Sequence, residues 1–150
     1  MMASDFKELE DLVMEDMRRV YSDTVIDHFQ NPRNVGEIKN PDGFGRLTGP
    51  CGDTMEIYLT VRGDTIVNAR FWTDGCGTSI ASGSMATELA TGKTVAEARS
   101  ITQDDVLESL GGLPEESVHC ALLAANALRE AVKDFLAMKK EPWKKAYRSR

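Results

Sequence analysis

The sequence has no long hydrophobic run, no excess of basic residues and only 7% aromatic residues. No apolar stretch approaches the ~18 residues that a membrane-spanning helix needs, so we expect no membrane-embedded segment. The 18 Lys and Arg are outnumbered by 24 Asp and Glu, and the formal net charge is −6. Such a chain offers no broad basic surface for neutralising phosphates, which argues against a nucleic-acid-binding protein.

Cysteine is also scarce, with three residues in a chain of 150. Three cysteines cannot all pair with one another. The first 20 residues carry neither the apolar core of a secretory signal nor the arginine-rich, acid-poor character of a transit peptide. We therefore expect a cytoplasmic protein with reduced thiols, in which metal binding or thiol chemistry is more plausible than disulfides. The length suits one domain that buries a core without such cross-links.

Residues 5–20 have the periodicity of an amphipathic helix, with Ser4 as a candidate N-cap. The apolar stripe of this helix consists of Phe6, Leu9, Leu12, Val13, Met17 and Val20. We expect this stripe to pack on the body of the protein, and an interaction with another molecule is the alternative. A second helix is predicted over residues 21–30. It ends before Asn31-Pro32, because the residue preceding a proline avoids the helical region.

The clearest strand signal is residues 55–62, where apolar and more polar residues alternate strictly. Residues 63–64 (Gly-Asp) suit a two-residue hairpin turn, and the return strand is predicted over residues 65–73. Alternation in the return strand places Val67, Ala69 and Phe71 on one face and Ile66, Asn68, Arg70 and Trp72 on the other. Residues 43–48 are a candidate third strand.

The second half of the chain is predicted to be helical. Small residues dominate 80–89, Thr94 and Glu97 have the spacing of a capping box, and Thr102 can cap another short helix. The longest helix is expected over residues 116–138. Its predicted core side consists of Val118, Leu122, Ala125, Leu128, Val132 and Phe135.

One apolar and one mixed sheet face imply that helices cover one side only. The predicted fold class is therefore α+β: a small antiparallel three-stranded sheet with helices packed on one face, in a single domain.

Each of the three cysteines is predicted to lie at the end of a secondary-structure element. Cys51 lies in a glycine-rich turn before a strand, and Cys76 lies where the return strand gives way to a helix. Cys120 follows His119 near the start of the long helix. Side chains at element ends can converge at one edge of a domain, and helix N-termini stabilise thiolates. Thiolates with an imidazole suit zinc, copper(I) or iron–sulfur chemistry, and Asp53 offers a harder, more exchangeable oxygen ligand.

A purely structural interpretation exists for each of these residues. A free cysteine is often only a small buried hydrophobic residue. That alternative is strongest for Cys120 on its helix, and weakest for Cys51 and Cys76, whose flanking glycines suggest close backbone approach to something bound. A lone histidine is more often a hydrogen-bonded structural residue than a ligand. We assign His28 to that class, whereas His119 is a better candidate for a ligand because Cys120 follows it in the sequence.

Four motifs resemble the IscU family, which includes the NifU N-terminal domain. They are YSDTVIDHFQNPRNVG (residues 21–36), the Gly-Pro-Cys51-Gly-Asp53 loop, GCGTSIAS (residues 75–82) and the His119-Cys120 pair, in the family's order. The resemblance covers roughly residues 21–138, which we take as an IscU-like scaffold domain. It leaves residues 1–20 as an N-terminal amphipathic helix extension and residues 139–150 as a basic C-terminal tail, which we expect to be solvated.

The resemblance implies a scaffold rather than an enzyme. An iron–sulfur cluster would be assembled on it, either [2Fe–2S] or [4Fe–4S] on a dimer, and passed to apo-proteins. The implied cluster or metal ligands are Cys51, Cys76 and Cys120, while His119 and Asp53 compete for the remaining coordination position. The resemblance also implies persulfide sulfur from a cysteine desulfurase, with Cys120 as the candidate acceptor. Iron would come separately and electrons from a donor such as ferredoxin. Asp53 would keep the cluster labile.

Two departures from the family bear on partners and branch. Bacterial and mitochondrial members typically carry Leu-Pro-Pro-Val-Lys before the His-Cys pair, where a specialised Hsp70-type chaperone docks. Here residues 113–117 read Leu-Pro-Glu-Glu-Ser, which argues against that partner. The related SufU branch carries an insertion after the middle cysteine motif and lacks the histidine. The presence of His119 and the lack of an evident insertion favour the IscU-like branch.

Two other functions remain open at this point. A zinc-binding sulfur-transfer protein, which accepts persulfide from a cysteine desulfurase and activates it, would use the same Cys, Asp and His donors in tetrahedral geometry. A thiol hydrolase is disfavoured, because three thiols exceed its needs and adjacent helical residues project about 100° apart, which separates His119 from Cys120. A monomer and a homo-oligomer around a cluster are both compatible with the sequence.

Overall fold

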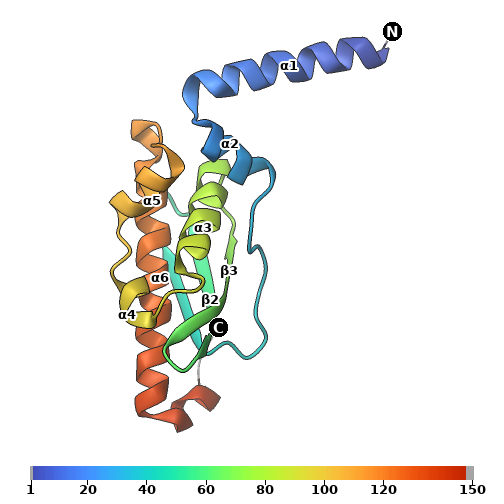
Figure 1. Cartoon of the computed structure of the whole chain (residues 1–150). Helices are drawn as coiled ribbons and strands as arrows, with labels where there is room; N and C mark the ends of the chain where they lie inside the picture. The colour runs from blue at the N-terminus through green and yellow to red at the C-terminus, as the bar shows by residue number, and fades with distance from the viewer. Residues whose placement is uncertain (1, 148–150) are drawn as a thin grey trace.

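Three antiparallel strands form a sheet in the order β1-β2-β3. The computed structural model describes residues 2–147, with the side chains of residues 6–144 and 146. Figure 1 shows the elements in chain order: α1 (Met2–Val20), α2 (Asp23–Gln30), β1 (Gly43–Thr48), β2 (Thr54–Arg62), β3 (Thr65–Thr73), α3 (Gly77–Ala90), α4 (Val95–Arg99), α5 (Gln103–Leu110), η1 (Glu115–Ser117), α6 (Val118–Lys140) and η2 (Pro142–Tyr147). The predicted α+β fold with three antiparallel strands in a single domain is confirmed.

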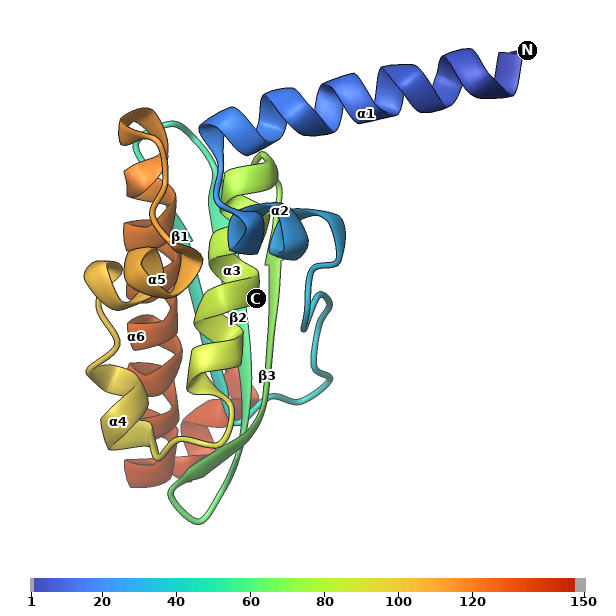
Figure 2. The same cartoon turned by 45° about the horizontal axis from the view of Figure 1, so that its top comes forward.

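Helices α3 and α6 cover one face of the sheet, as Figures 1 and 2 show. Residues Met55, Ile57 and Leu59 of β2 are fully buried, as their strict alternation predicts. The approach of β1 to α6 requires glycine, because a Cβ atom at Gly45 would lie 2.3 Å from the carbonyl oxygen of Ala127. The prediction that helices pack on one face of the sheet is therefore confirmed.

A β-bulge corrects the predicted faces of β3. The register between β2 and β3 shifts between Thr60 and Val61, so Thr60 pairs with Asn68 while Val61 pairs with Ile66. The extra residue, Val67, turns outward and is 44% exposed, whereas Ile66 is completely buried. Strict alternation assigned these two residues to the opposite faces, because an inserted residue changes the phase of a strand.

The long helix differs from its prediction in two respects. α6 begins at Val118, after the short 3₁₀ helix η1, instead of near residue 116. Leu122, assigned to the core side, is 43% exposed, while Leu123 is buried. Most other core positions of α6 are alanines, which let the helix lie close to the sheet. Such small residues carry little hydrophobic signal, so the centre of the buried face could not be located accurately from periodicity.

The N-terminal helix does not pack on the body as predicted. α1 begins at Met2, so Ser4 lies within its first turn and is not the N-cap. Figures 1 and 2 show α1 projecting from the body beyond α2. Most of its predicted apolar stripe stays exposed, with Phe6 at 66% and Leu9 at 60%, while Met17 is partly buried. Ser22 caps α2 instead, by accepting a hydrogen bond from the Val25 N–H.

The predicted caps of the short helices are present. Thr94 and Glu97 form a capping box at α4, and Thr102 forms another with Asp105 at α5. None of the described helices is long and apolar enough to cross a membrane.

The basic tail is partly helical. α6 continues to Lys140, and the Lys139 ammonium lies 3.4 Å from the Asp64 carboxylate in the β2–β3 turn. Lys144 pairs with Glu141. Arg148 and Arg150 lie outside the described residues.

Candidate metal and thiol site

A tight turn between β1 and β2 presents Cys51 and Asp53. The N–H of Gly49 donates a 2.8 Å hydrogen bond to the Asp53 carbonyl, and the N–H of Gly52 donates to the Gly49 carbonyl. Gly52 has φ of 87°, a left-handed conformation that favours glycine. The glycines of this motif therefore close the turn, which leaves the Cys51 thiol exposed at its tip.

Cys76 occupies the N-cap position of α3. Its Sγ atom lies 3.1 Å from the Oγ1 atom of Thr78. The Thr78 hydroxyl, followed by the backbone N–H groups of Ser79 and Thr78, lowers the pKa of the Cys76 thiol, although partial burial opposes this effect. The thiolate is stabilised because the unpaired N–H groups of a helix start are hydrogen-bond donors. The predicted helix-terminal environment of Cys76 is thus present.

Cys120, in the first turn of α6, is the most enclosed of the three thiols, at 2% exposed. The Thr78 Oγ1 atom lies 3.4 Å from its Sγ atom, so one hydroxyl contacts both Cys76 and Cys120. The Ser79 hydroxyl lies 3.5 Å from the same sulfur and 3.2 Å from the Asp53 carboxylate. Because a serine has one hydroxyl proton, it can donate to only one of these acceptors at a time.

His119 lies between two thiols. Its Nε2 atom is 3.4 Å from the Sγ atom of Cys51 and 3.7 Å from that of Cys120. The expectation that helix geometry separates His119 from Cys120 is therefore wrong, because the imidazole ring reaches back toward its neighbour. Cys51, which is distant in the sequence, is the closer of the two.

The five predicted site residues come together at one edge of the domain. His119 connects Cys51 with Cys120, Thr78 connects Cys76 with Cys120, and Ser79 connects Asp53 with Cys120. In the part of the chain that the structure describes, no three His, Cys, Asp or Glu side chains are already arranged to hold a metal ion. The convergence that element ends predict is confirmed, and the ligand set stays a prediction.

Sequence reasoning assigned no role to Thr78 and Ser79. Their hydroxyls contact the two cysteines and the carboxylate from the first turn of α3. The available signal was their position, two and three residues after a cysteine at a predicted helix start. Hydroxyl residues there are usually interpreted as caps.

His28 lies apart from this edge and has a structural role. It is buried, and its Nδ1 atom lies 2.7 Å from the Ser84 hydroxyl. Its assignment as a hydrogen-bonded core histidine is confirmed.

The fold and this edge define a small α+β protein with a cysteine-centred site. The family model described as NifU-like N terminal domain matches residues 20–142, and the chain belongs to this family.

Curated relatives carry a consistent name. The chain is 55% identical over 117 residues to iron–sulfur cluster assembly scaffold protein IscU 1 of Archaeoglobus fulgidus, covering 77% of this chain and 76% of that protein. It is 44% identical over 120 residues to the scaffold protein IscU of Escherichia coli K12, covering 77% and 93%.

Two solved structures share the fold. An iron–sulfur cluster assembly scaffold protein for the SUF system from Fervidobacterium islandicum superposes with a TM-score of 0.60 at 26% identity, covering 75% of this chain and 96% of that one. The N-terminal NifU-like protein of Brucella abortus superposes with a TM-score of 0.62 at 19% identity, covering 79% and 95%, and supports the fold alone.

Proposed function

We propose that this chain is a scaffold, not an enzyme, on which an iron–sulfur cluster is assembled before transfer to apo-proteins. The observation that carries this proposal is the convergence of three free thiols, His119 and Asp53 at one edge of a domain of this family. The names of the curated relatives support the same function. The cluster is cargo and does not remain as a resident cofactor.

The donors at this edge fit such a cargo. Cys51, Cys76 and Cys120 supply soft thiolates, which suit iron in a [2Fe–2S] cluster and equally suit zinc in the isolated protein. His119 and Asp53 are the candidates for the remaining position. Like-charged thiolates repel one another until a cation arrives, so binding would draw the donors closer. A [4Fe–4S] cluster would require donors from a second copy.

In this proposal, Cys120 takes part in sulfur delivery through a covalent step. The Cys120 thiolate attacks the outer sulfur of a persulfide on a cysteine desulfurase, which forms a Cys120 persulfide and releases the desulfurase thiolate. Two electrons per sulfur, from a donor such as ferredoxin, then reduce the outer sulfur to sulfide and regenerate the Cys120 thiolate. Because Cys120 is buried beside Thr78, this edge must open for the attack.

A scaffold of this kind needs other proteins that supply sulfur and electrons and that accept the cluster. The partners are a cysteine desulfurase, an electron donor and apo-protein acceptors. Glu115 and Glu116 are exposed in η1, and their charge disfavours the Hsp70-type partner. Free thiols suit the reducing cytoplasm. We take residues 21–138 as the scaffold domain, with residues 1–20 and 139–150 as additions.

Anaerobic reconstitution tests the function. The full chain is incubated with iron, cysteine, a reductant and a desulfurase, and then mixed with an apo-ferredoxin. The expected result is a visible cluster chromophore that moves to the ferredoxin. Cys51→Ala should abolish stable retention, whereas Asp64→Ala, in the distant β2–β3 turn, should behave as wild type. Tight zinc binding with desulfurase stimulation and no transferable cluster would instead establish the sulfur-transfer alternative.

A further inference from the structure

Helix α1 displays an apolar surface that no other element covers. Phe6, Leu9, Leu12, Val13 and Val20 are each between 50% and 66% exposed, and we call these five residues the exposed stripe. Scattered exposed apolar residues are ordinary, but these five share one side of the helix with Met17, which bridges Val13 and Val20, and such a strip marks an interaction surface. The family match begins at residue 20, so nearly all of this strip lies outside the family domain.

The body contacts α1 along one edge of its apolar side. Within residues 6–20, only Met14 and Met17 are partly buried, and the Met14 sulfur accepts a 3.1 Å hydrogen bond from Gln30 in α2. At about 100° per residue, Met17 lies beside Phe6 and Val13 at one edge of the exposed stripe, and Met14 lies about a quarter turn beyond that edge. The body therefore leaves the stripe accessible. A 19-residue helix with so little tertiary packing gains stability when its apolar side is covered.

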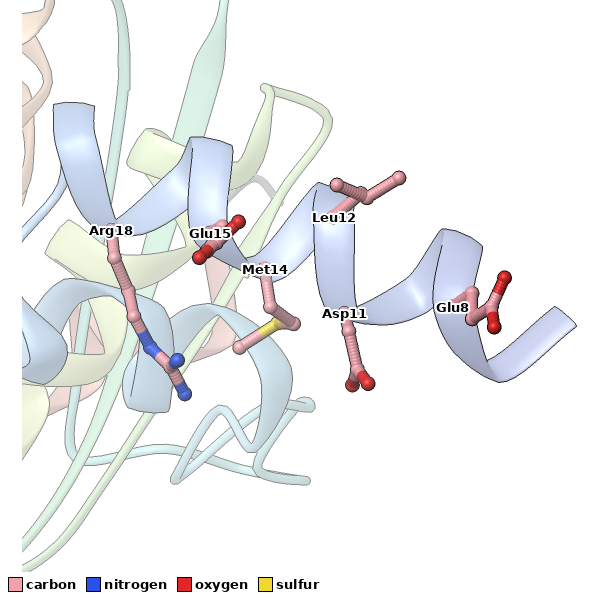
Figure 3. Close-up of a pocket in the computed structure, with 6 residues that line it drawn as sticks. All are labelled: Glu8, Asp11, Leu12, Met14, Glu15 and Arg18. Atoms are coloured by element: carbon pink, nitrogen blue, oxygen red, sulfur yellow. The ribbon is translucent and has the colours of Figure 1, made fainter. Parts of the chain in front are cut away.

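The polar side of α1 is mainly acidic, which limits the kind of partner. Figure 3 shows this side of the helix: Asp11, Met14 and Arg18 point to one side, and Leu12 points to the opposite side. Glu8 and Glu15 add further negative charge. An acidic polar side disfavours an anionic membrane surface, where amphipathic helices use lysine and arginine. The stripe thus favours a protein partner.

Charge along the helix favours a second copy of this chain in antiparallel orientation. Its N-terminal half is net acidic, with Glu8, Glu10 and Asp11 against Lys7, whereas in its C-terminal half Arg18 and Arg19 balance Glu15 and Asp16. A parallel pair would place like charges side by side, whereas an antiparallel pair places Arg19 of each copy near Glu8 of the other. Arg19 forms an exposed 3.3 Å ion pair with Asp16 of its own helix. Its guanidinium has further N–H groups that can contact Glu8 of the second copy at the same time.

We propose that this protein self-associates through α1, with the exposed stripes of two copies packed in an antiparallel pair. At the two-fold axis, Val13 of one chain lies opposite Val13 of the other. Phe6 of each chain lies opposite Val20 of the other. The two bodies occupy opposite ends of the helix pair, because α1 projects away from its own body (Figures 1 and 2). This contact requires no metal or cluster and is independent of the proposed function.

Sedimentation of the full chain with chelator and reductant tests the contact, because these exclude bridging clusters and disulfides. Wild type should show a monomer–dimer equilibrium between micromolar and several-hundred-micromolar concentration. Val13→Glu places two carboxylates at the axis and should weaken the dimer at least about tenfold, with unchanged far-ultraviolet circular dichroism. Asp11→Lys, on the opposite side of the helix, should leave the dimer intact. A monomeric wild type, or a dimer insensitive to Val13→Glu, overturns the proposal.

A charge swap tests the orientation. Glu8→Arg alone and Arg19→Glu alone each create like-charge contacts at both ends of the pair, so each should weaken the dimer several-fold at low salt. An equimolar mixture of the two variants restores opposite charges at both ends and should recover wild-type affinity. If neither single variant weakens the dimer, or if the mixture does not recover, the antiparallel arrangement is wrong.

Discussion

The Nε2 atom of His119 lies 3.4 Å from the Sγ atom of Cys51, although 68 positions separate these residues in the sequence. Asp53, only two residues after Cys51, instead accepts a hydrogen bond from Ser79 at the start of α3. The two candidates for the last ligand position thus have different surroundings, one beside two sulfurs and the other beside a hydroxyl. This difference makes their roles separable by substitution.

Asp53→Ala should slow release of the cluster. Without the weak oxygen donor, the three thiolates and the His119 imidazole remain to hold the cargo, so transfer to apo-ferredoxin should slow about tenfold or more. The measurement is the rate of chromophore transfer after reconstitution. Asp64→Ala makes the same chemical change in an exposed turn and should not alter the rate. Faster release from Asp53→Ala would show that the carboxylate is a retaining ligand.

Ser79→Ala should weaken metal binding without removing a ligand. Its hydroxyl contacts the Asp53 carboxylate and the Cys120 sulfur, and loss of such a supporting contact typically costs 10–100-fold in metal affinity. Competition with a zinc chelator measures the change. Ser82→Ala is the matched control, because the buried Ser82 hydroxyl has no hydrogen-bond partner among the described residues. Equal affinities for the two variants would contradict a supporting role for Ser79.

Much of the fold followed from the sequence because its signals are local. Strict alternation predicted β2, and residues 63–64 predicted the hairpin turn. The predicted edge also formed, because each cysteine lies at the end of an element and these ends meet at one edge of the domain. The four resembling motifs then supplied the family.

The remaining features depend on contacts between distant segments. The bulge at Val67 arises from pairing between two strands, which single-strand periodicity cannot represent. The exposed stripe of α1 satisfies the same periodicity as a packed helix, so amphipathicity alone cannot indicate what covers it. The contacts of Thr78 with two sulfurs require the approach of α6 to α3, which no local pattern encodes.

The bulge gives a stability test on two adjacent residues of β3. Ile66→Ala should lower the free energy of unfolding by about 2–5 kcal/mol, because a completely buried side chain leaves a cavity. Val67→Ala removes an exposed side chain and should change it by only about 0.5 kcal/mol. Urea denaturation of the metal-free protein measures both. The reverse order of effects would match uninterrupted alternation and would contradict the bulge.

Acidification should destabilise the protein through His28. Burial, reinforced by the nearby Arg33 charge, lowers the pKa of His28, while Asp27 and Glu88 oppose this shift. The folded protein therefore binds a proton less readily than the unfolded chain, whose histidine pKa is about 6.5. The neutral ring's contribution to stability is fully present above that value. It is lost as pH falls from about 6.5 toward the lowered folded-state pKa.

The matched comparison is His28→Gln, which can still hydrogen-bond the Ser84 hydroxyl but does not titrate. Urea midpoints measured from about pH 7.5 to about pH 5.5 bracket the ordinary histidine pKa. The wild type should lose more stability than the variant over this interval, because other titrating groups contribute equally to both proteins. Parallel pH profiles would mean that His28 is protonated as readily in the fold as in the unfolded chain.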